Sequence, residues 1–345
     1  MKLRDALADV LDPGLLTDGG PGWEADALLA VPTSGSTGGP KTVLLSAEAL
    51  VVSAEATHAR LGGPGTWLLA LPPTHIAGVQ VLVRSVVAGT EPGRTDLSAG
   101  FRASGFAAAA RPVLAEPGPH YTALVPTQLA RLIAADGPGL AAVRGFDAVL
   151  VGGAATPPHL LARGRELGVR LVTTYGMSET AGGCVYDGVP LDGVRVRIVD
   201  GRVELAGPTL ALGYRGGERF GEWFRTDDLG VLDDGVLRVL GRADDVIVTG
   251  GEKVDPAAVE RVLAARPGVL EACVVGVPDA EWGQVVVAVV VAVDPADPPA
   301  VEGLAAAVRA EVGRFAVPKR VAFADALPLR GPGKVDRTAV AHTFE

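Results

Sequence analysis

Residues 147–175 read DAVLVGGAATPPHLLARGRELGVRLVTTY. The stretch opens with a short apolar run, Asp147 to Val151, and closes with a second one, Val169 to Tyr175, and both have the pattern of buried strands. After a glycine pair, a helical pattern follows, for which we expect Thr156 as the N-cap and Pro157 at the first position. Strand, glycine loop, helix and strand in this order are typical of a parallel sheet, whose ligands lie beyond the carboxyl ends of its strands.

The same alternation extends over about residues 28–191. We expect strands over residues 66–71 and 121–125, a helix that ends at Gly89, and another helix that starts at Pro126. These elements predict a large N-terminal domain of the α/β class, built mostly on parallel sheets.

The pattern changes after Leu191. Apolar residues then alternate with a period of two around Asp200–Gly201 and again around Asp234–Gly235, which predicts two hairpins in a small antiparallel β layer. From Asp244 a third pattern begins, with expected elements of a compact α+β unit: a helix over 256–265, strands over 272–277 and 285–293, and a helix over 301–312. We therefore predict an N-terminal domain of residues 1–243 and a small mobile C-terminal domain of residues 244–345, with the polar GRADD segment at their boundary.

The composition excludes several classes of function. The 345 residues carry a net charge of −9 without a Lys/Arg block, so we expect neither a nucleic acid nor an anionic membrane as partner. The most apolar run, Val285 to Val293, is far shorter than the roughly 20 residues of a membrane helix, and no secretory h-region is visible, so we expect a cytoplasmic protein. Cys184 and Cys273 form no paired motif and are expected to be reduced thiols in the core.

A second informative stretch is TSGSTGGPK, residues 33–41. It almost matches a Walker A loop, but Pro40 replaces the last glycine, and proline has no backbone N–H to offer a phosphate. Strand-like residues follow Lys41, and we expect Ser46 to cap the next helix, so the loop is predicted to connect a hairpin. A plain surface turn is one interpretation; a wrap around polyphosphate is the other, with Lys41 adding a charge to the small and hydroxyl residues Thr33, Ser34, Gly35, Ser36, Thr37 and Gly38.

Three further stretches carry residues suited to nucleotide chemistry. In TTYGMSETAGG, residues 173–183, Tyr175 can stack on a base, Thr180 can reach a phosphate oxygen, and Glu179 can hold Mg²⁺; a polar loop is the alternative. EWFRTDDLG, residues 222–230, places Asp227 and Asp228 at a predicted turn, where a buried carboxylate could accept ribose hydroxyls; a β-turn cap is the alternative.

The third stretch is GRADDVIVTGGEKVDP, residues 241–256. It offers Arg242 for a ribose or phosphate and the pair Gly250–Gly251, where a backbone must pass close to something; an interdomain linker is the alternative. Near the end, Lys334 lies on a loop made pliable by glycines, or is simply a solvated lysine.

Together these stretches, in this order, resemble the adenylate-forming superfamily of acyl-CoA synthetases, adenylation domains and luciferases. The resemblance extends from about Val31 to Arg337, nearly the whole chain. It implies an acid–thiol ligase that uses ATP and Mg²⁺: a carboxylate attacks the α-phosphate to give acyl-AMP and pyrophosphate, and a thiol, such as that of coenzyme A, then displaces AMP.

The resemblance also implies a role for each matching residue. The loop of residues 33–41 would hold the β- and γ-phosphates, Glu179 would hold Mg²⁺, and Thr180 would contact phosphate. Asp244 would be the hinge of the small domain, and Lys334 would bridge the reacting carboxylate and the α-phosphate during adenylation only. The rest of the implied nucleotide and thiol site comprises Gly152, Gly153, Ala154, Tyr175, Gly176, Met177, Ser178, Asp228, Arg242, Gly250 and Gly251.

Within the superfamily, residues 71–89, 122–132 and 149–158 are most similar to the o-succinylbenzoate–CoA ligases of menaquinone biosynthesis, in their short form. The resemblance implies an aromatic carboxylic acid as substrate, with His75 as a gate or contact to the acid; a histidine that caps its helix is the alternative. Such an acid keeps a second carboxylate, for which a polar or cationic contact is expected. The weaker pocket candidates are Gln80, Arg84, Thr127 and Gln128, although Arg84 could instead pair on the surface.

One departure from the family pattern concerns the start of the chain. The phosphate loop begins at residue 33, so most of the usual first subdomain is missing, and we expect a homodimer partner to complete the acyl pocket. Another aryl- or small-acid–CoA ligase, a carrier-protein-loading adenylation domain and a nucleotide-binding relic without activity are the alternatives. Retention of Lys334 argues against the relic.

Overall fold

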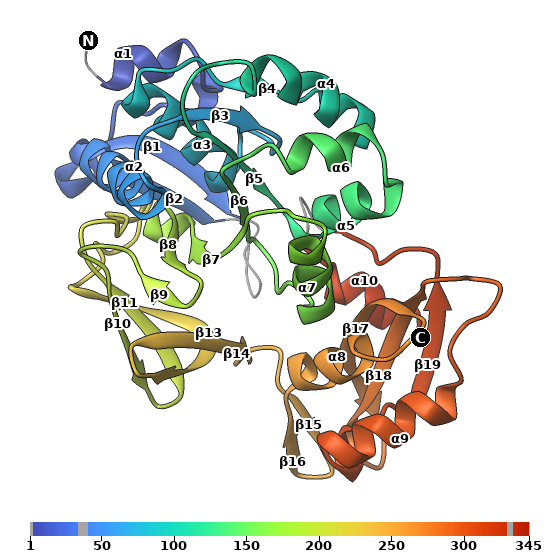
Figure 1. Cartoon of the computed structure of the whole chain (residues 1–345). Helices are drawn as coiled ribbons and strands as arrows, with labels where there is room; N and C mark the ends of the chain where they lie inside the picture. The colour runs from blue at the N-terminus through green and yellow to red at the C-terminus, as the bar shows by residue number, and fades with distance from the viewer. Residues whose placement is uncertain (1–2, 34–40, 330–333, 345) are drawn as a thin grey trace.

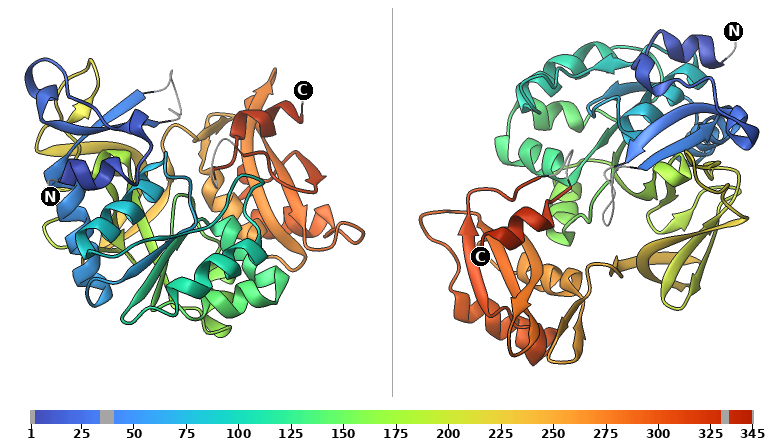
Figure 2. Two further views of the ribbon diagram at one scale, coloured as in Figure 1. Left: turned by 90° about the horizontal axis from the view of Figure 1, so that it is seen from above. Right: turned by 180° about the vertical axis from the view of Figure 1, so that it is seen from behind.

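The computed structural model of the chain describes residues 3–33, 41–329 and 334–344. Figure 1 shows two parts joined by the short segment that follows β14 (Val236–Arg242). The smaller part begins with β15 (Ile247–Thr249) and lies beside α5 (Pro126–Ala135) and α7 (Pro158–Glu166) of the larger part, as the further views in Figure 2 also show. This arrangement confirms the predicted α/β architecture of a large N-terminal and a small C-terminal part.

A seven-stranded sheet forms the centre of the larger part. Its pairs from β4 to β7 are parallel, as predicted, and β8 and β9 extend it antiparallel. Alternate residues enter different cores, Trp67 and Leu69 on one face and Leu68 and Ala70 on the other, so both faces are covered. In spatial order its strands are β4 (Gly93–Arg94), β3 (Thr66–Leu69), β5 (His120–Leu124), β6 (Ala148–Val151), β7 (Leu171–Met177), β8 (Gly182–Tyr186) and β9 (Val189–Pro190).

Local capping signals explain where the helices around this sheet begin and end. The Ser46 hydroxyl accepts a bond from the backbone of Ala49 at the start of α2 (Ala47–Leu61), and Gly89 ends α3 (Ile76–Ala88) with a φ of 68°, both as predicted. The predicted Thr156 cap is wrong. Pro157 is the N-cap of α7, because the following Pro158 disfavours a helical backbone conformation at Pro157. The other helices here are α1 (Leu3–Ala8), α4 (Ala103–Val113) and α6 (Pro138–Val143), with the 3₁₀ turns η1 (Pro13–Leu15), η2 (Gly22–Asp26) and η3 (Ser178–Thr180).

The hairpin predicted around the phosphate loop is confirmed at its base. β1 (Ala27–Thr33) and β2 (Lys41–Ser46) are antiparallel, with Thr33 opposite Lys41, and β12 (Gly213–Tyr214) pairs with β2 on its other side. The intervening residues 34–40, and therefore the predicted contacts of that loop, lie outside the described residues.

The predicted antiparallel layer is a four-stranded sheet of β10 (Arg195–Val199), β11 (Arg202–Ala206), β13 (Trp223–Asp233) and β14. Its hairpins turn at Asp200–Gly201 and Asp234–Gly235, and all four residues have the positive φ that the sequence pattern requires. The turn predicted at Asp227 and Asp228 is wrong. Both lie within β13, where Asp228 pairs with Arg242 of β14.

The smaller part contains a five-stranded sheet with a core on each face. β17 (Val269–Asp279) and β18 (Gly283–Ala292) are its long strands; β15, β16 (Glu252–Val254) and β19 (Arg320–Ala324) flank them, and α8 (Pro256–Ala264), α9 (Val301–Glu311), η4 (Arg314–Ala316) and α10 (Arg337–His342) cover them. The linker interpretation of Gly250–Gly251 is wrong, because this pair forms the β15–β16 turn with φ of 57° and 83°. A Cβ on Gly250 would come 2.6 Å from the ring of Trp282.

The structure also bears on membrane-spanning helices and on the two cysteines. Within the described ranges, no helix is long and apolar enough to cross a membrane. Cys184 and Cys273 are buried free thiols, as predicted, and burial raises the pKa of each to about 12.

Candidate active site

A buried carboxylate lies beside the end of β7. The Tyr175 hydroxyl donates a 2.6 Å hydrogen bond to Asp228, whose residue is only 9% exposed. Burial raises the pKa of both groups, and the bond from Tyr175 opposes this rise for Asp228. The sequence singled out both residues, and the fold brings them together from strands 53 positions apart.

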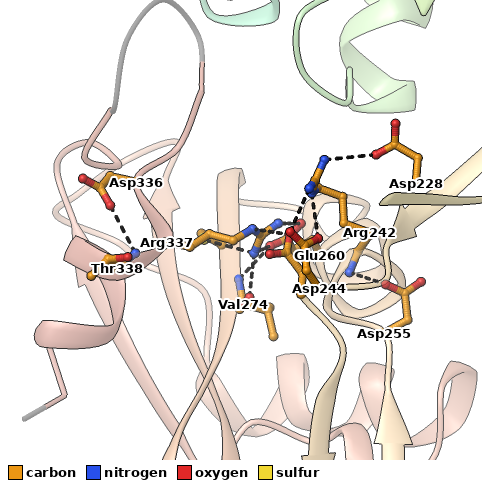
Figure 3. Close-up of polar contacts among 12 residues, drawn as sticks. Asp228, Arg242, Asp244, Asp255, Glu260, Val274, Asp336, Arg337 and Thr338 are labelled. Carbon is orange, nitrogen blue, oxygen red and sulfur yellow. Dashed lines mark hydrogen bonds and ion pairs between the residues drawn. The ribbon is translucent and has the colours of Figure 1, made fainter. Parts of the chain in front are cut away.

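Arg242 connects this pair to the segment between the two parts of the molecule (Figure 3). Its guanidinium donates to both oxygens of Asp244, at 2.8 and 2.7 Å, and to Asp228 at 3.4 Å. Burial alone would lower the pKa of Arg242, but the bonds and charge of Asp244 outweigh it and raise that pKa. The site therefore combines a hydroxyl, a carboxylate and a fixed cation, which suits recognition of a sugar and phosphate.

Glu179 belongs to a second group of contacts, in the turn η3 that directly follows β7. The Tyr214 hydroxyl donates to Glu179 over 2.8 Å, and the Lys41 ammonium lies 4.8 Å from the centre of the Tyr214 ring. Burial and the Glu179 charge raise the pKa of Tyr214. Tyr214 was not predicted, because its contact with Glu179 spans 35 residues and no local pattern marks it. It connects the base of the phosphate loop to the predicted metal ligand.

The prediction that Thr180 reaches a phosphate is wrong. Thr180 is fully buried, and its hydroxyl accepts from the backbone N–H of Met177 at 2.9 Å and donates to the carbonyl of Gly182 at 2.7 Å. These bonds fix the turn that holds Glu179. Ser178, half-buried in the same turn, is the hydroxyl that remains nearer the surface.

Glycines make space at the carboxyl ends of β6 and β7. A Cβ on Gly152 would lie 2.2 Å from the Thr174 hydroxyl oxygen, and one on Gly176 would lie 2.1 Å from the carbonyl oxygen of Gly182. Gly153 has a φ of 83°, and Ala154 beside it is exposed. These residues lie at the carboxyl ends of β6 and β7, which is the edge where the sequence predicts the ligand.

His75 and Lys334 approach each other from the two parts of the molecule. His75 occupies the N-cap position of α3, as the capping interpretation expects, but its side chain makes no capping hydrogen bond. Partial burial and the positive charge of Lys334 lower the pKa of His75. Lys334 is exposed on the segment before α10, and its charge acts on His75, at the start of α3.

Gln80 and Arg84 lie one turn apart on α3 and are both buried. Gln80 donates to the carbonyl of Ala181 at 2.6 Å, and Arg84 donates to the Tyr186 hydroxyl at 3.1 Å with its guanidinium 4.9 Å from the Trp67 ring. The surface-pairing interpretation of Arg84 is therefore wrong. Within the described residues, Arg84 has no carboxylate within 4.0 Å, and Gln80 Oε1 and Arg84 Nε have no hydrogen-bond partner. Burial lowers the Arg84 pKa.

The two remaining pocket candidates differ. Gln128 accepts from the backbone N–H of Val125 and donates to the carbonyl of Ala70, so its side chain caps α5 and is used by the fold. Thr127 is half-buried in the first turn of the same helix.

Comparisons with known proteins identify the family of the chain. Residues 16–215 match the AMP-binding enzyme family, and residues 258–334 match the AMP-binding enzyme C-terminal domain. A probable 2-succinylbenzoate–CoA ligase of Mycobacterium tuberculosis is 49% identical over 328 residues, which cover 92% of this chain and 85% of the relative.

Two solved structures have a similar fold over most of this chain. An o-succinylbenzoate CoA synthetase of Bacillus subtilis, in complex with its acyl-adenylate intermediate, has a TM-score of 0.76 at 29% identity, over 90% of this chain and 68% of that one. An amide bond synthetase of Marinactinospora thermotolerans has a TM-score of 0.80 at 29% identity, over 93% and 70%. The chain belongs to the AMP-binding enzymes, the adenylate-forming superfamily.

Proposed function

We propose that this chain is an AMP-forming 2-succinylbenzoate–CoA ligase of menaquinone biosynthesis. One carboxylate of the acid attacks the α-phosphate of ATP and releases pyrophosphate; the CoA thiol then attacks the acyl-adenylate and releases AMP. The 49% identical relative and the solved complex with an acyl-adenylate support this reaction. Because ATP and CoA are the co-substrates, we expect the enzyme to work in the cytoplasm.

The observation that carries the choice of acid is Arg84. It is a buried cation, 3% exposed, with no carboxylate partner among the described residues. A buried charge without a counter-ion is costly, and a ligand that brings the counter-ion removes that cost. Of the two carboxylates on 2-succinylbenzoate, one reacts and the other remains free to pair with Arg84. An acid with a single carboxylate would leave the cation unpaired.

The nucleotide is assigned to the residues at the ends of β6, β7 and β13. Asp228, held by Tyr175 and Arg242, would accept the ribose hydroxyls, and the glycines after β6 would let the adenine approach the backbone. Lys41 and the loop before it would hold the β- and γ-phosphates. We assign the hydroxyl contact to phosphate to Ser178, which is not fully buried, and no longer to Thr180.

For Mg²⁺ we propose Glu179, whose carboxylate Tyr214 orients. No group of three or more His, Cys, Asp or Glu side chains able to hold a metal is present in the described part of the chain. A single carboxylate nevertheless fits Mg²⁺, which usually keeps several waters and binds largely through substrate phosphates. When bound, the ion would neutralise phosphate charge.

Lys334 is proposed as the cation that acts only during adenylation. Negative charge grows around the α-phosphorus in the transition state, so a positioned ammonium stabilises that state more than the ground state. Rotation of the small domain about Asp244, at the proposed boundary between residues 243 and 244, would then withdraw Lys334. The thiol would enter beside Gly250–Gly251, with His75 at the acid.

The test is a panel of acids with CoA as acceptor. We expect pyrophosphate release and thioester formation to be fastest with 2-succinylbenzoate and at least 100-fold slower, about 2.7 kcal/mol, with benzoate or a fatty acid. A preference for either of those acids would overturn the assigned substrate. Offering CoA and a simple amine together tests the acceptor: an amide as the main product would contradict CoA as the acceptor.

A further inference from the structure

The segment that carries Lys334 is closed at its base. Leu329 and Val335 form an isolated antiparallel bridge, and the backbone N–H of Asp336 donates to the carbonyl of Pro328 at 2.8 Å. The Asp336 side chain then caps α10, accepting from the backbone N–H groups of Thr338 and Ala339. Contacts that fix the first residue of α10 therefore also fix the base of the loop on which Lys334 lies.

That first residue is Arg337, three positions after Lys334. Its guanidinium donates to both oxygens of Glu260 on α8, at 2.7 and 3.2 Å, and to the carbonyl of Val274 at 2.7 Å (Figure 3). Its Nε also lies 3.0 Å from a carboxylate oxygen of Asp245. Glu260 in turn accepts the backbone N–H of Val274 at 2.8 Å, so this cluster joins α8, β17 and the segment before β15.

Asp245 is next to the proposed hinge residue Asp244, and the two carboxylates pair with arginines of different parts of the molecule. Asp244 accepts both bonds from Arg242, which belongs to the larger part and also reaches Asp228. Asp245 pairs with Arg337 of the smaller part. When backbone torsions change at residue 244, Asp245 and Arg337 stay on the same side of the rotation. The contacts of Arg337 can therefore persist in both orientations.

We propose that Arg337 is a positioning residue for adenylation: it fixes the base of the Lys334 loop to α8 and to the hinge-side carboxylate of Asp245. A lysine has a long flexible side chain, and only its backbone anchor can give it a defined position. With that anchor, rotation about Asp244 delivers the ammonium to one place at the acid-binding end of α3. The proposal rests on the adenylation role assigned to Lys334.

A purely structural role predicts a different result. If Arg337 only stabilised the smaller part, its loss would slow adenylation and thioester formation together, because both need a folded C-terminal domain. If it positions Lys334, only adenylation slows, since Lys334 has left the site when the thiol reacts. The ratio of the two half-reactions therefore separates the roles.

The experiment compares Arg337→Gln with Lys334→Ala and a matched control. Arg266→Gln is the control, because Arg266 makes one ion pair with Glu311 on the surface of the same part. Adenylation is measured as single-turnover pyrophosphate release, and the second half-reaction as thioester formation from supplied acyl-adenylate and CoA. Thermal unfolding reports the integrity of each variant.

We expect Arg337→Gln to slow adenylation about 10- to 100-fold, the usual effect of displacing a catalytic group by about 1 Å, and to leave thioester formation within two-fold. Arg266→Gln should change neither. Arg337→Lys keeps the charge but not the bidentate fork, so its adenylation rate should lie between those of wild type and Arg337→Gln. If Arg337→Gln unfolds, Arg337→Lys takes its place as the test variant. Asp245→Asn should slow adenylation alone, by less than Arg337→Gln.

Three results would overturn the proposal, and the first two can be told apart from the third. Equal slowing of both half-reactions by Arg337→Lys, or no slowing of adenylation, refutes the positioning role while the proposed function stands. If Lys334→Ala itself leaves adenylation intact, the assigned role of Lys334 fails, and the role of Arg337 fails with it.

Discussion

Replacing Arg84 with Met separates the contribution of this side chain to stability from its contribution to binding. Met has a similar length and fills the space under Trp67, but removes a buried charge that has no acidic partner among the described residues. In the wild type, the contact with Trp67 contributes about 2 kcal/mol and the bond to Tyr186 about 1 kcal/mol. Desolvation of the charge opposes them by several kcal/mol. We therefore expect the free energy of unfolding to change by less than about 2 kcal/mol, or to increase.

Binding of the substrate should respond in the opposite way. A hydrogen bond between charged groups contributes about 1.5–3 kcal/mol, so kcat/KM for 2-succinylbenzoate should fall roughly 10- to 150-fold in Arg84→Met. The value for benzoate, which has no second carboxylate, should stay within about three-fold. The assay is pyrophosphate release with each acid, together with urea unfolding. Arg60→Met is the control, because Arg60 is a partly exposed arginine of α2 whose hydrogen bonds within the described residues go to backbone carbonyls of β9.

Either of two results would refute this reasoning. An unchanged kcat/KM for 2-succinylbenzoate would mean that Arg84 does not meet the second carboxylate. A loss of unfolding free energy above about 3 kcal/mol, the sum of its contacts, would mean that Arg84 is retained for the core and not for the ligand.

Three further predictions concern other side chains. Burial and the charge of Arg84 lower the pKa of His58 to about 4. The neutral ring therefore contributes about 3 kcal/mol of stability above pH 6.5, which is lost as the pH falls toward 4. His58→Gln should flatten this pH dependence in urea unfolding at about pH 7.5 and 4.5, and an unchanged dependence would contradict the prediction. Tyr214→Phe keeps the ring under Lys41 but frees Glu179, and should weaken Mn²⁺ binding to the ATP complex about 10-fold by electron paramagnetic resonance; unchanged affinity would remove this role. Lys41→Ala should raise the KM for ATP about 10-fold with little change in kcat, whereas a collapse of kcat at saturating ATP would show a role in the chemical step.

The backbone of this protein could be predicted because its signals are local. Pro40 excluded a helix after the phosphate loop, Ser46 gave the start of α2, and the Asp-Gly pairs gave two hairpins. The errors are also local, where two signals compete: Pro158 disfavours helical backbone at Pro157, and strand pairing with β14 takes Asp228 out of the predicted turn.

Side-chain partners could be predicted much less well. Almost every face of α3 is apolar, so no periodic pattern tells whether Arg84 points to solvent or to the core. Thr180 looks like a phosphate ligand in sequence, yet the backbone of its own turn takes its hydroxyl. Tyr214 and Arg337 meet partners 35 and 77 residues away, and nothing in their surroundings along the chain indicates this.

The opposite pairing of Asp244 and Asp245 has a consequence for exchanging C-terminal domains between related enzymes. A junction between these two residues leaves Arg242 with Asp244 in one parent and Arg337 with Asp245 in the other, so each guanidinium keeps the carboxylate with which it pairs. A junction one residue later joins Arg337 to a foreign neighbour. Hybrid enzymes cut after Asp244 should therefore retain both half-reactions more often than those cut after Asp245, although the two differ by one amino acid.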